Sequence, residues 1–239
     1  MAQFLKENFI SLIIIVLGFA FKTIYDFLMK KTVKRVRIAN ANTRYNGYDI
    51  AKKVLDYFDV QDYKIAKTEN GQMDSFNFVD KTVYISMPSY EKKTLDILAS
   101  AAHKAGLAVE SYKKRGLFYI INLLIWIVRI SSIVSVFALV ISLFIKKYFV
   151  VKVCLIVFAL SIVMFIFGYI SDSIACNYVK EFVNNSVFLT ESETKTLFEL
   201  LDLIKCSYIS MVFQPVTFLF IGVFAVISKF IQLLTGRKL

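Results

Sequence analysis

The sequence has one histidine, His103, only two prolines and three cysteines among its 239 residues. With a single histidine, any metal site would need carboxylates or thiolates as its remaining ligands. Cys154, Cys176 and Cys206 form no close pair, which argues against a disulfide framework and against a Cys-x-x-Cys metal site. Because prolines are so few and no tract is of low complexity, nothing marks a flexible linker between domains.

Apolar residues make up 57% of the chain, more than an ordinary soluble domain contains. They gather in long runs, and about 20 such residues are enough for a helix to cross a bilayer. A basic cluster from Lys30 to Arg37 follows the first run, and no small-residue cleavage site does, so we expect a retained helix rather than a secretory signal. The four expected transmembrane helices are residues 9–29, 117–145, 149–170 and 207–234.

The positive charge of the chain is explained by this topology. The formal net charge is +11, and residues 30–116 hold 17 Lys or Arg against 10 Asp or Glu. Much of this excess borders the expected membrane ends, where positive charge indicates a cytoplasmic orientation. We therefore expect no nucleic-acid partner, and we expect residues 30–116 and 171–206 to lie in the cytosol with the lipid bilayer as a partner.

The cytosolic segment between the first two runs predicts a small α+β domain. Asn46 can cap a helix that runs to about Phe58, and residues 62–68 and 81–87 have the Tyr, Ile and Val content of short strands. Pro88 then opens a helix of about twenty residues, in which His103 lies beside the apolar stripe. The stripe expected to face the core consists of Leu95, Leu98, Ala102, Ala105 and Val109.

Arg129 interrupts the second apolar run, and an arginine at the centre of a bilayer is costly. We therefore expect residues 117–127 to lie along the membrane interface, ahead of a span that begins near Val128. The whole chain is predicted to be a predominantly α-helical integral membrane protein with a small α+β cytosolic domain. Its expected parts are an N-terminal transmembrane helix (1–29), the cytosolic domain (30–116), the interfacial segment with two transmembrane helices (117–170), a cytosolic helical segment (171–206) and a C-terminal transmembrane helix (207–239).

Three stretches, in this order, carry a resemblance to a known family. Residues 46–56 read Asn-Gly-Tyr-Asp-Ile-Ala-Lys-Lys-Val-Leu-Asp, residues 74–77 read Asp-Ser-Phe-Asn and lead into 81–86, and residues 101–106 read Ala-Ala-His-Lys-Ala-Gly. With its expected spans, the chain resembles the bacterial membrane zinc metallopeptidases of the YugP type. The resemblance implies a zincin-like cytosolic domain and a location in the bacterial cell membrane.

The resemblance also implies an HExxH motif, in which two histidines four residues apart bind zinc and the glutamate activates water. Here His103 stands at the first histidine, Lys104 at the glutamate that acts as general base, and Leu107 at the second histidine. Ser171 and Asp172 correspond to the stretch in which the family carries a further acidic ligand. We therefore expect these five residues to form a vestigial site, with no catalytic residue, no metal and no cofactor.

Two arrangements of this site remain open. If residues 171–182 are helical, Asp172 and Cys176 share a face and could bind zinc together with His103. In the other arrangement, Asp172 pairs with Lys104 and a salt bridge fills the metal position.

Three functions follow from these readings. The leading hypothesis is a catalytically inactive pseudopeptidase that binds a membrane or cytosolic protein partner as a scaffold or regulatory subunit. One alternative is an active zinc-dependent endopeptidase with noncanonical ligands. The other is a small membrane transporter subunit, which is disfavoured because the expected spans contain few polar residues.

Overall fold

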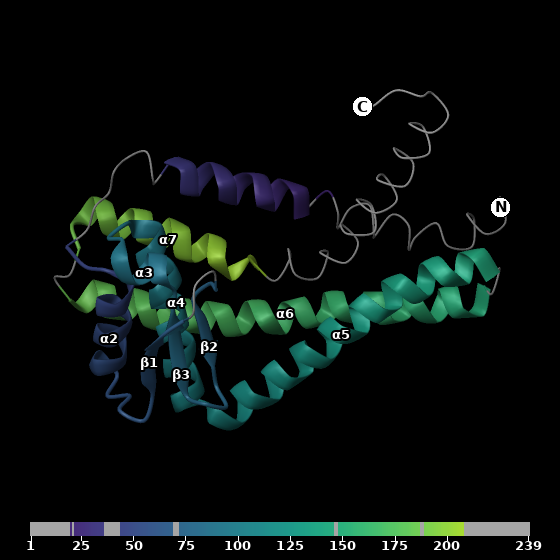
Figure 1. The fold of residues 1–239 in the computed structure, drawn as a ribbon, viewed down its shortest axis with the longest axis horizontal. Helices are drawn as coiled ribbons and strands as arrows, with labels where there is room; N and C mark the ends of the chain where they lie inside the picture. The colour runs from purple at the N-terminus through teal and green to yellow at the C-terminus, as the bar shows by residue number, and fades with distance from the viewer. Residues whose placement is uncertain are drawn as a thin grey trace. The chain divides into compact units, whose positions relative to one another are not determined.

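The computed structural model describes residues 20, 22–35, 44–68, 72–145, 148–186 and 189–207. Residues 22–35 are helical, and the elements that follow them are labelled in Figure 1. They are α2 (Gly47–Tyr57), β1 (Lys64–Lys67), β2 (Ser75–Asn77), β3 (Thr82–Ile85), α3 (Met87–Glu91), α4 (Leu95–Lys113), α5 (Arg115–Ile145), α6 (Tyr148–Asn185) and α7 (Glu191–Lys205).

The chain divides into two compact units. One consists of Met1–Asp26, Trp126–Phe165 and Ile209–Leu239, and the other of Phe27–Ile125 and Ile166–Tyr208. The second unit contains the sheet, helices α2 to α4, helix α7 and the C-terminal part of α6. Every residue of the candidate site belongs to this second unit.

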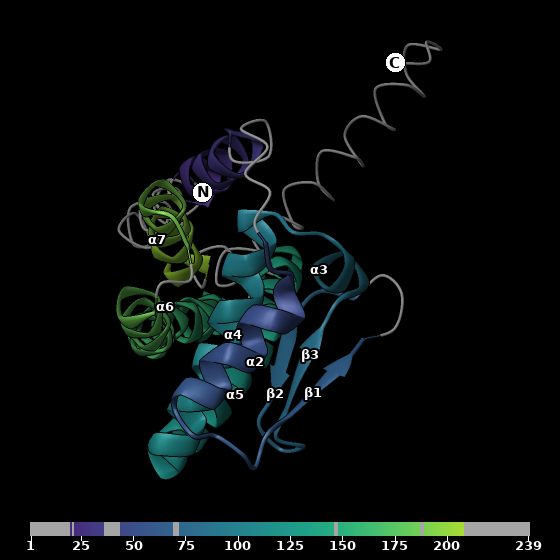
Figure 2. The same ribbon diagram turned by 90° about the vertical axis from the view of Figure 1, so that its left-hand side faces the viewer.

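The sheet of the second unit has three strands in the order β1-β3-β2. Strand β1 runs parallel to β3, with Lys64 beside Thr82, and β2 runs antiparallel to β3, with Phe76 beside Val83. Helices α2 and α4 cover one face of this sheet (Figure 2). The short central strand β3 is the most buried of the three, because Val83 and Ile85 both reach the core under these helices.

Two helices begin at sequence-encoded caps. At the start of α2 the Asn46 side chain accepts a hydrogen bond from the Asp49 backbone N–H, and the Asp49 carboxylate accepts one from the Asn46 N–H. Thr190 and Glu193 form the same reciprocal capping box at α7. The helix predicted from Asn46 is therefore confirmed, because two otherwise unpaired backbone donors are satisfied locally.

The strands predicted at 62–68 and 81–87 are confirmed as β1 and β3, whereas the single helix predicted from Pro88 is wrong. Helix α3 ends at Glu91, the backbone of Lys92 and Thr94 is extended, and α4 starts at Leu95. All five residues of the predicted stripe on α4 are buried in the core. The core also takes side chains from α2, α6 and α7, among them Val54, Val179 and Leu197.

The prediction of a multi-pass membrane protein with four transmembrane helices is wrong for the part of the chain that the structure describes. None of the helices among these residues is both long enough and apolar enough to cross a membrane. Hydropathy counts every apolar residue of a run toward a span, but Phe118 and Ile121 of α5 are buried, and α6 carries Lys152 and Asp172. The expected location in the bacterial cell membrane depended on the same helices and is corrected with them.

Several expected parts of the chain have a different place in the structure. Residues 117–127, expected along a membrane interface, belong to helix α5. Helix α6 contains the expected span 149–170 and continues through the first part of the segment 171–206. The expected spans 9–29 and 207–234 lie largely outside the described residues.

Helices α4 and α6 come into close backbone contact at Gly106. A Cβ atom built on Gly106 would lie 2.4 Å from the Ala175 carbonyl oxygen and 3.0 Å from Cγ2 of Val179. These distances are too short for any side chain, so the contact requires glycine at this position.

Replacing Gly106 by alanine is therefore expected to destabilise the protein by about 1–3 kcal/mol, because the backbones of α4 and α6 have to move apart. Gly116→Ala is the matched control, since a Cβ at Gly116 meets nothing within 4 Å and alanine favours a helix. Chemical denaturation of the two variants measures the difference. Equal stabilities would contradict the close contact.

Candidate functional site

His103 is buried between α4 and α6. Its side chain is 2% exposed, and its Nε2 lies 3.1 Å from Oδ1 of Asp172, which is buried to the same degree on α6. Since a carboxylate oxygen accepts hydrogen bonds, the geometry assigns the proton to Nε2. Helix α4 thus presents its histidine to a carboxylate 69 residues further along the chain.

The other ring nitrogen of His103 is left without a partner. Among the described residues, Nδ1 is the only buried side-chain nitrogen or oxygen that has no hydrogen bond. A protonated ring would bury a second, unpaired N–H, which is more costly than a bare lone pair. In agreement, burial and then the positive charge of Lys104 lower the pKa of His103, and the neighbouring Asp172 only partly opposes them. The site therefore contains a neutral imidazole.

Lys104, the next residue of α4, is partly exposed, although its ammonium is surrounded by protein. Burial lowers the pKa of Lys104, and the charges of Asp172 and Asp74 oppose the shift. No ion pair joins Lys104 to Asp172; the partner of Asp172 is His103, through Oδ1. This leaves Lys104 near two carboxylates without a direct contact to either.

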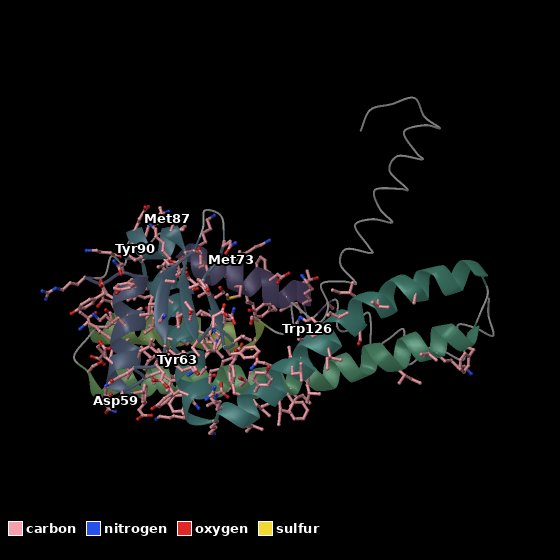
Figure 3. The ribbon with its side chains drawn as sticks, turned by 60° about the horizontal axis from the view of Figure 1, so that its bottom comes forward. Asp59, Tyr63, Met73, Met87, Tyr90 and Trp126 are labelled. Carbon is pink, nitrogen blue, oxygen red and sulfur yellow. The ribbon has the colours of Figure 1, made fainter. Side chains whose placement is uncertain are left out.

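Asp74 is a buried site residue that sequence reasoning missed. Its Oδ1 accepts a 2.8 Å hydrogen bond from the backbone N–H of Ser86, and its Oδ2 accepts one of 2.8 Å from Oγ of Ser89. Both serines belong to the start of α3, which Met87 and Tyr90 mark in Figure 3. Asp74 thereby ties the N-terminus of α3 to the segment just before β2.

A second buried pair lies beside His103 and Asp172. Oγ of Ser171 donates a 2.9 Å hydrogen bond to Oε2 of Glu110, and both side chains are about 2% exposed. Burial raises the pKa of Glu110 to about 7, and the bond from Ser171 limits the increase. Glu110 lies seven residues after His103, about two helical turns, and therefore on the same face of α4, but nothing in the sequence indicates Ser171 as its partner.

The remaining predicted residues bring no metal ligand to this site. Leu107 is partly exposed and has no donor atom. Sγ of Cys176 lies 3.5 Å from the Leu201 carbonyl oxygen, and burial raises the pKa of its thiol to about 12. In the part of the chain that the structure describes, no three His, Cys, Asp or Glu side chains group so as to hold a metal ion. His103, Asp172 and Cys176 are therefore not arranged as a ligand set.

Glu110 makes the stability of the protein depend on pH. Its pKa of about 7 in the folded protein exceeds the ordinary value of 4.5, so folding favours the protonated acid. The contribution of Glu110 to the free energy of unfolding is therefore fully present below pH 4.5 and is lost as pH rises through 7. We expect Glu110→Gln, which stays neutral, to raise the free energy of unfolding at pH 8 by about 1–2 kcal/mol relative to the unaltered chain.

Denaturant unfolding at pH 5 and pH 8 measures this effect, and His103 is present in both proteins, so its own titration cancels. Glu91→Gln is the control, because Glu91 is exposed at the end of α3. We expect it to change stability by less than about 0.5 kcal/mol at either pH. If Glu110→Gln destabilises the protein equally at both pH values, the carboxyl group is not protonated by folding.

Comparison with known proteins gives one match. A family model described as "Putative neutral zinc metallopeptidase" matches residues 11–227, which is most of the chain. The resemblance predicted from residues 46–56, 74–86 and 101–106 is thereby confirmed. Among curated proteins and solved structures, none matches the chain.

Proposed function

The chain belongs to the neutral zinc metallopeptidase family, and from this premise we propose that it is a non-catalytic member that binds a protein or peptide without cutting it. The observation that carries the proposal is the hydrogen bond between His103 and Asp172. It engages Nε2 of the histidine that the family motif assigns to zinc and leaves Nδ1 as the only ring nitrogen without a partner. The chain has no second histidine to replace it.

The residues at the motif do not fit a zinc ion. A catalytic zinc needs about three protein ligands and an open position for water. Because Nε2 of His103 is bonded to Asp172, the ring offers at most one ligand, Nδ1, and Leu107 offers no lone pair at the position of the second histidine. Lys104 stands where the family motif has its glutamate, and in its ammonium form it neither accepts a proton nor tolerates a nearby metal cation. The chain therefore lacks the ligands for zinc and, independently, the carboxylate base for catalysis.

A binding role is supported by the parts of the second unit that remain intact. Packing and catalysis are separate requirements, and the core around α4 is complete without a metal. Several large apolar side chains of this unit are also exposed just after β2 and at the start of α5, where the rings of Phe78 and Phe118 are 6.1 Å apart. They are Val79 (68%), Leu117 (55%), Ile120 (57%) and Tyr119 (51%). Apolar surface of this kind suits a scaffold or regulatory subunit that contacts another protein.

Metal analysis of the purified full-length chain tests the loss of the zinc site. We expect no bound zinc in the unaltered protein and about one equivalent in the Lys104→Glu, Leu107→His double variant, which restores the base and the second histidine. The matched control is Lys104→Gln, Leu107→Gln, which changes the same positions without adding a carboxylate or an imidazole. Stoichiometric zinc in the unaltered protein, lost in His103→Ala, would overturn the proposal.

Catalysis is tested directly with an unfolded protein substrate. We expect the purified chain to leave the substrate intact over hours, with or without added zinc, because neither a metal-bound water nor a carboxylate base is present. A catalytically competent metallopeptidase supplies the positive control for the substrate. Cleavage that a chelator abolishes would show an active enzyme with noncanonical ligands.

A further inference from the structure

Two hydrogen-bonded pairs connect α4 to α6 side by side. His103 and Glu110 lie seven residues apart on α4, about two helical turns, and therefore on one face. Their partners Asp172 and Ser171 are consecutive on α6. Between the two pairs along α4 lies Gly106, which packs closely against the backbone of α6.

All four polar side chains are almost fully buried, and this burial sets the energetic consequence. Each is about 2% exposed, so water cannot replace a lost partner. Removing one member of such a pair costs the desolvation of the member left behind, which exceeds the value of an exposed hydrogen bond. The pairs can therefore fasten the two helices in a way that solvent-exposed bonds cannot.

We propose that the His103–Asp172 and Glu110–Ser171 pairs form a metal-free joint that fixes α4 to α6, so that the residues at the motif are retained for packing instead of chemistry. The proposal rests on the proposed function in one respect, namely that zinc does not occupy the site. A metal ion would hold the helices by accepting lone pairs from their side chains. The joint holds them through N–H and O–H donors, which all come from the chain itself.

A double-mutant cycle on the full-length chain tests the joint. The variants are His103→Leu, Asp172→Leu and the two combined, and the measurement is the melting temperature Tm with zinc and with a chelator. We expect each single variant to lower Tm by about 2–12 °C, since one buried polar group is left unpaired. The double variant should lower Tm by less than the sum, because no unpaired group remains.

Controls address variants that fail to fold and effects unrelated to the pairs. Ser171→Ala removes only the bond to Glu110 and should lower Tm by several degrees. Asp172→Asn keeps an acceptor for His103 and should lower Tm by less. Ser173→Ala makes the same change as Ser171→Ala at a partly exposed position two residues away. It should leave Tm within about 1 °C.

The outcomes separate the joint from the proposed function. Additive losses in the cycle, with a Tm that zinc does not change, would overturn the joint and leave the non-catalytic role intact. A non-additive cycle combined with chelator-sensitive cleavage would overturn the non-catalytic role alone. A Tm of the unaltered protein that rises by several degrees with zinc would overturn both.

Discussion

Helix α4 is the most enclosed helix of the candidate site, and the polar side chains that it buries need hydrogen-bond partners within the protein. It lies against the sheet, α2 and α7, and His103 and Glu110 are hydrogen-bonded to α6, so both side chains are about 2% exposed. Burying an unpaired polar group costs about 1–3 kcal/mol, a large part of the net stability of a domain. Ser171 and Asp172 on α6 meet this requirement for Glu110 and for Nε2 of His103, and Gly106 allows α6 to come close enough.

The electrostatics of the site follow from the same burial. Desolvation is the largest influence on His103, Lys104 and Glu110, and in each it favours the uncharged form. Carboxylates of Asp172 and Asp74 oppose this effect for Lys104 without contacting it. Burial thus works against a concentration of charge at this site, and the positive charge of Lys104 would further oppose a divalent cation.

Local sequence signals predicted the elements that local interactions determine. The Asn46 cap needs only Asp49, three residues away, and the spacing of Leu95, Leu98 and Ala102 defines a helix face without knowledge of its partner. The break between α3 and α4 was missed, because nothing in the composition of residues 92–94 excludes a helix. The apolar runs misled for a related reason, since hydropathy does not tell a residue buried in a core from one facing lipid.

The site shows the same division between local and long-range information. His103 could be singled out because the motif around it is contiguous, and the family match confirmed the resemblance. Its bond to Asp172 and the bond between Glu110 and Ser171 span 69 and 61 residues, so they depend on how α6 packs against α4. Asp74 was missed because its partners, Ser86 and Ser89, lie 12 and 15 residues further along the chain, after β3.

The central claim is that the single histidine of the chain is bonded to Asp172 and not to a metal ion. Because His103 is the only imidazole, the ¹⁵N NMR spectrum of the histidine-labelled protein reports its two ring nitrogens without assignment. We expect a neutral ring at pH 7 with the proton on Nε2, and nitrogen signals that zinc does not shift. A proton on Nδ1, or an Nε2 signal displaced by added zinc, would contradict the account.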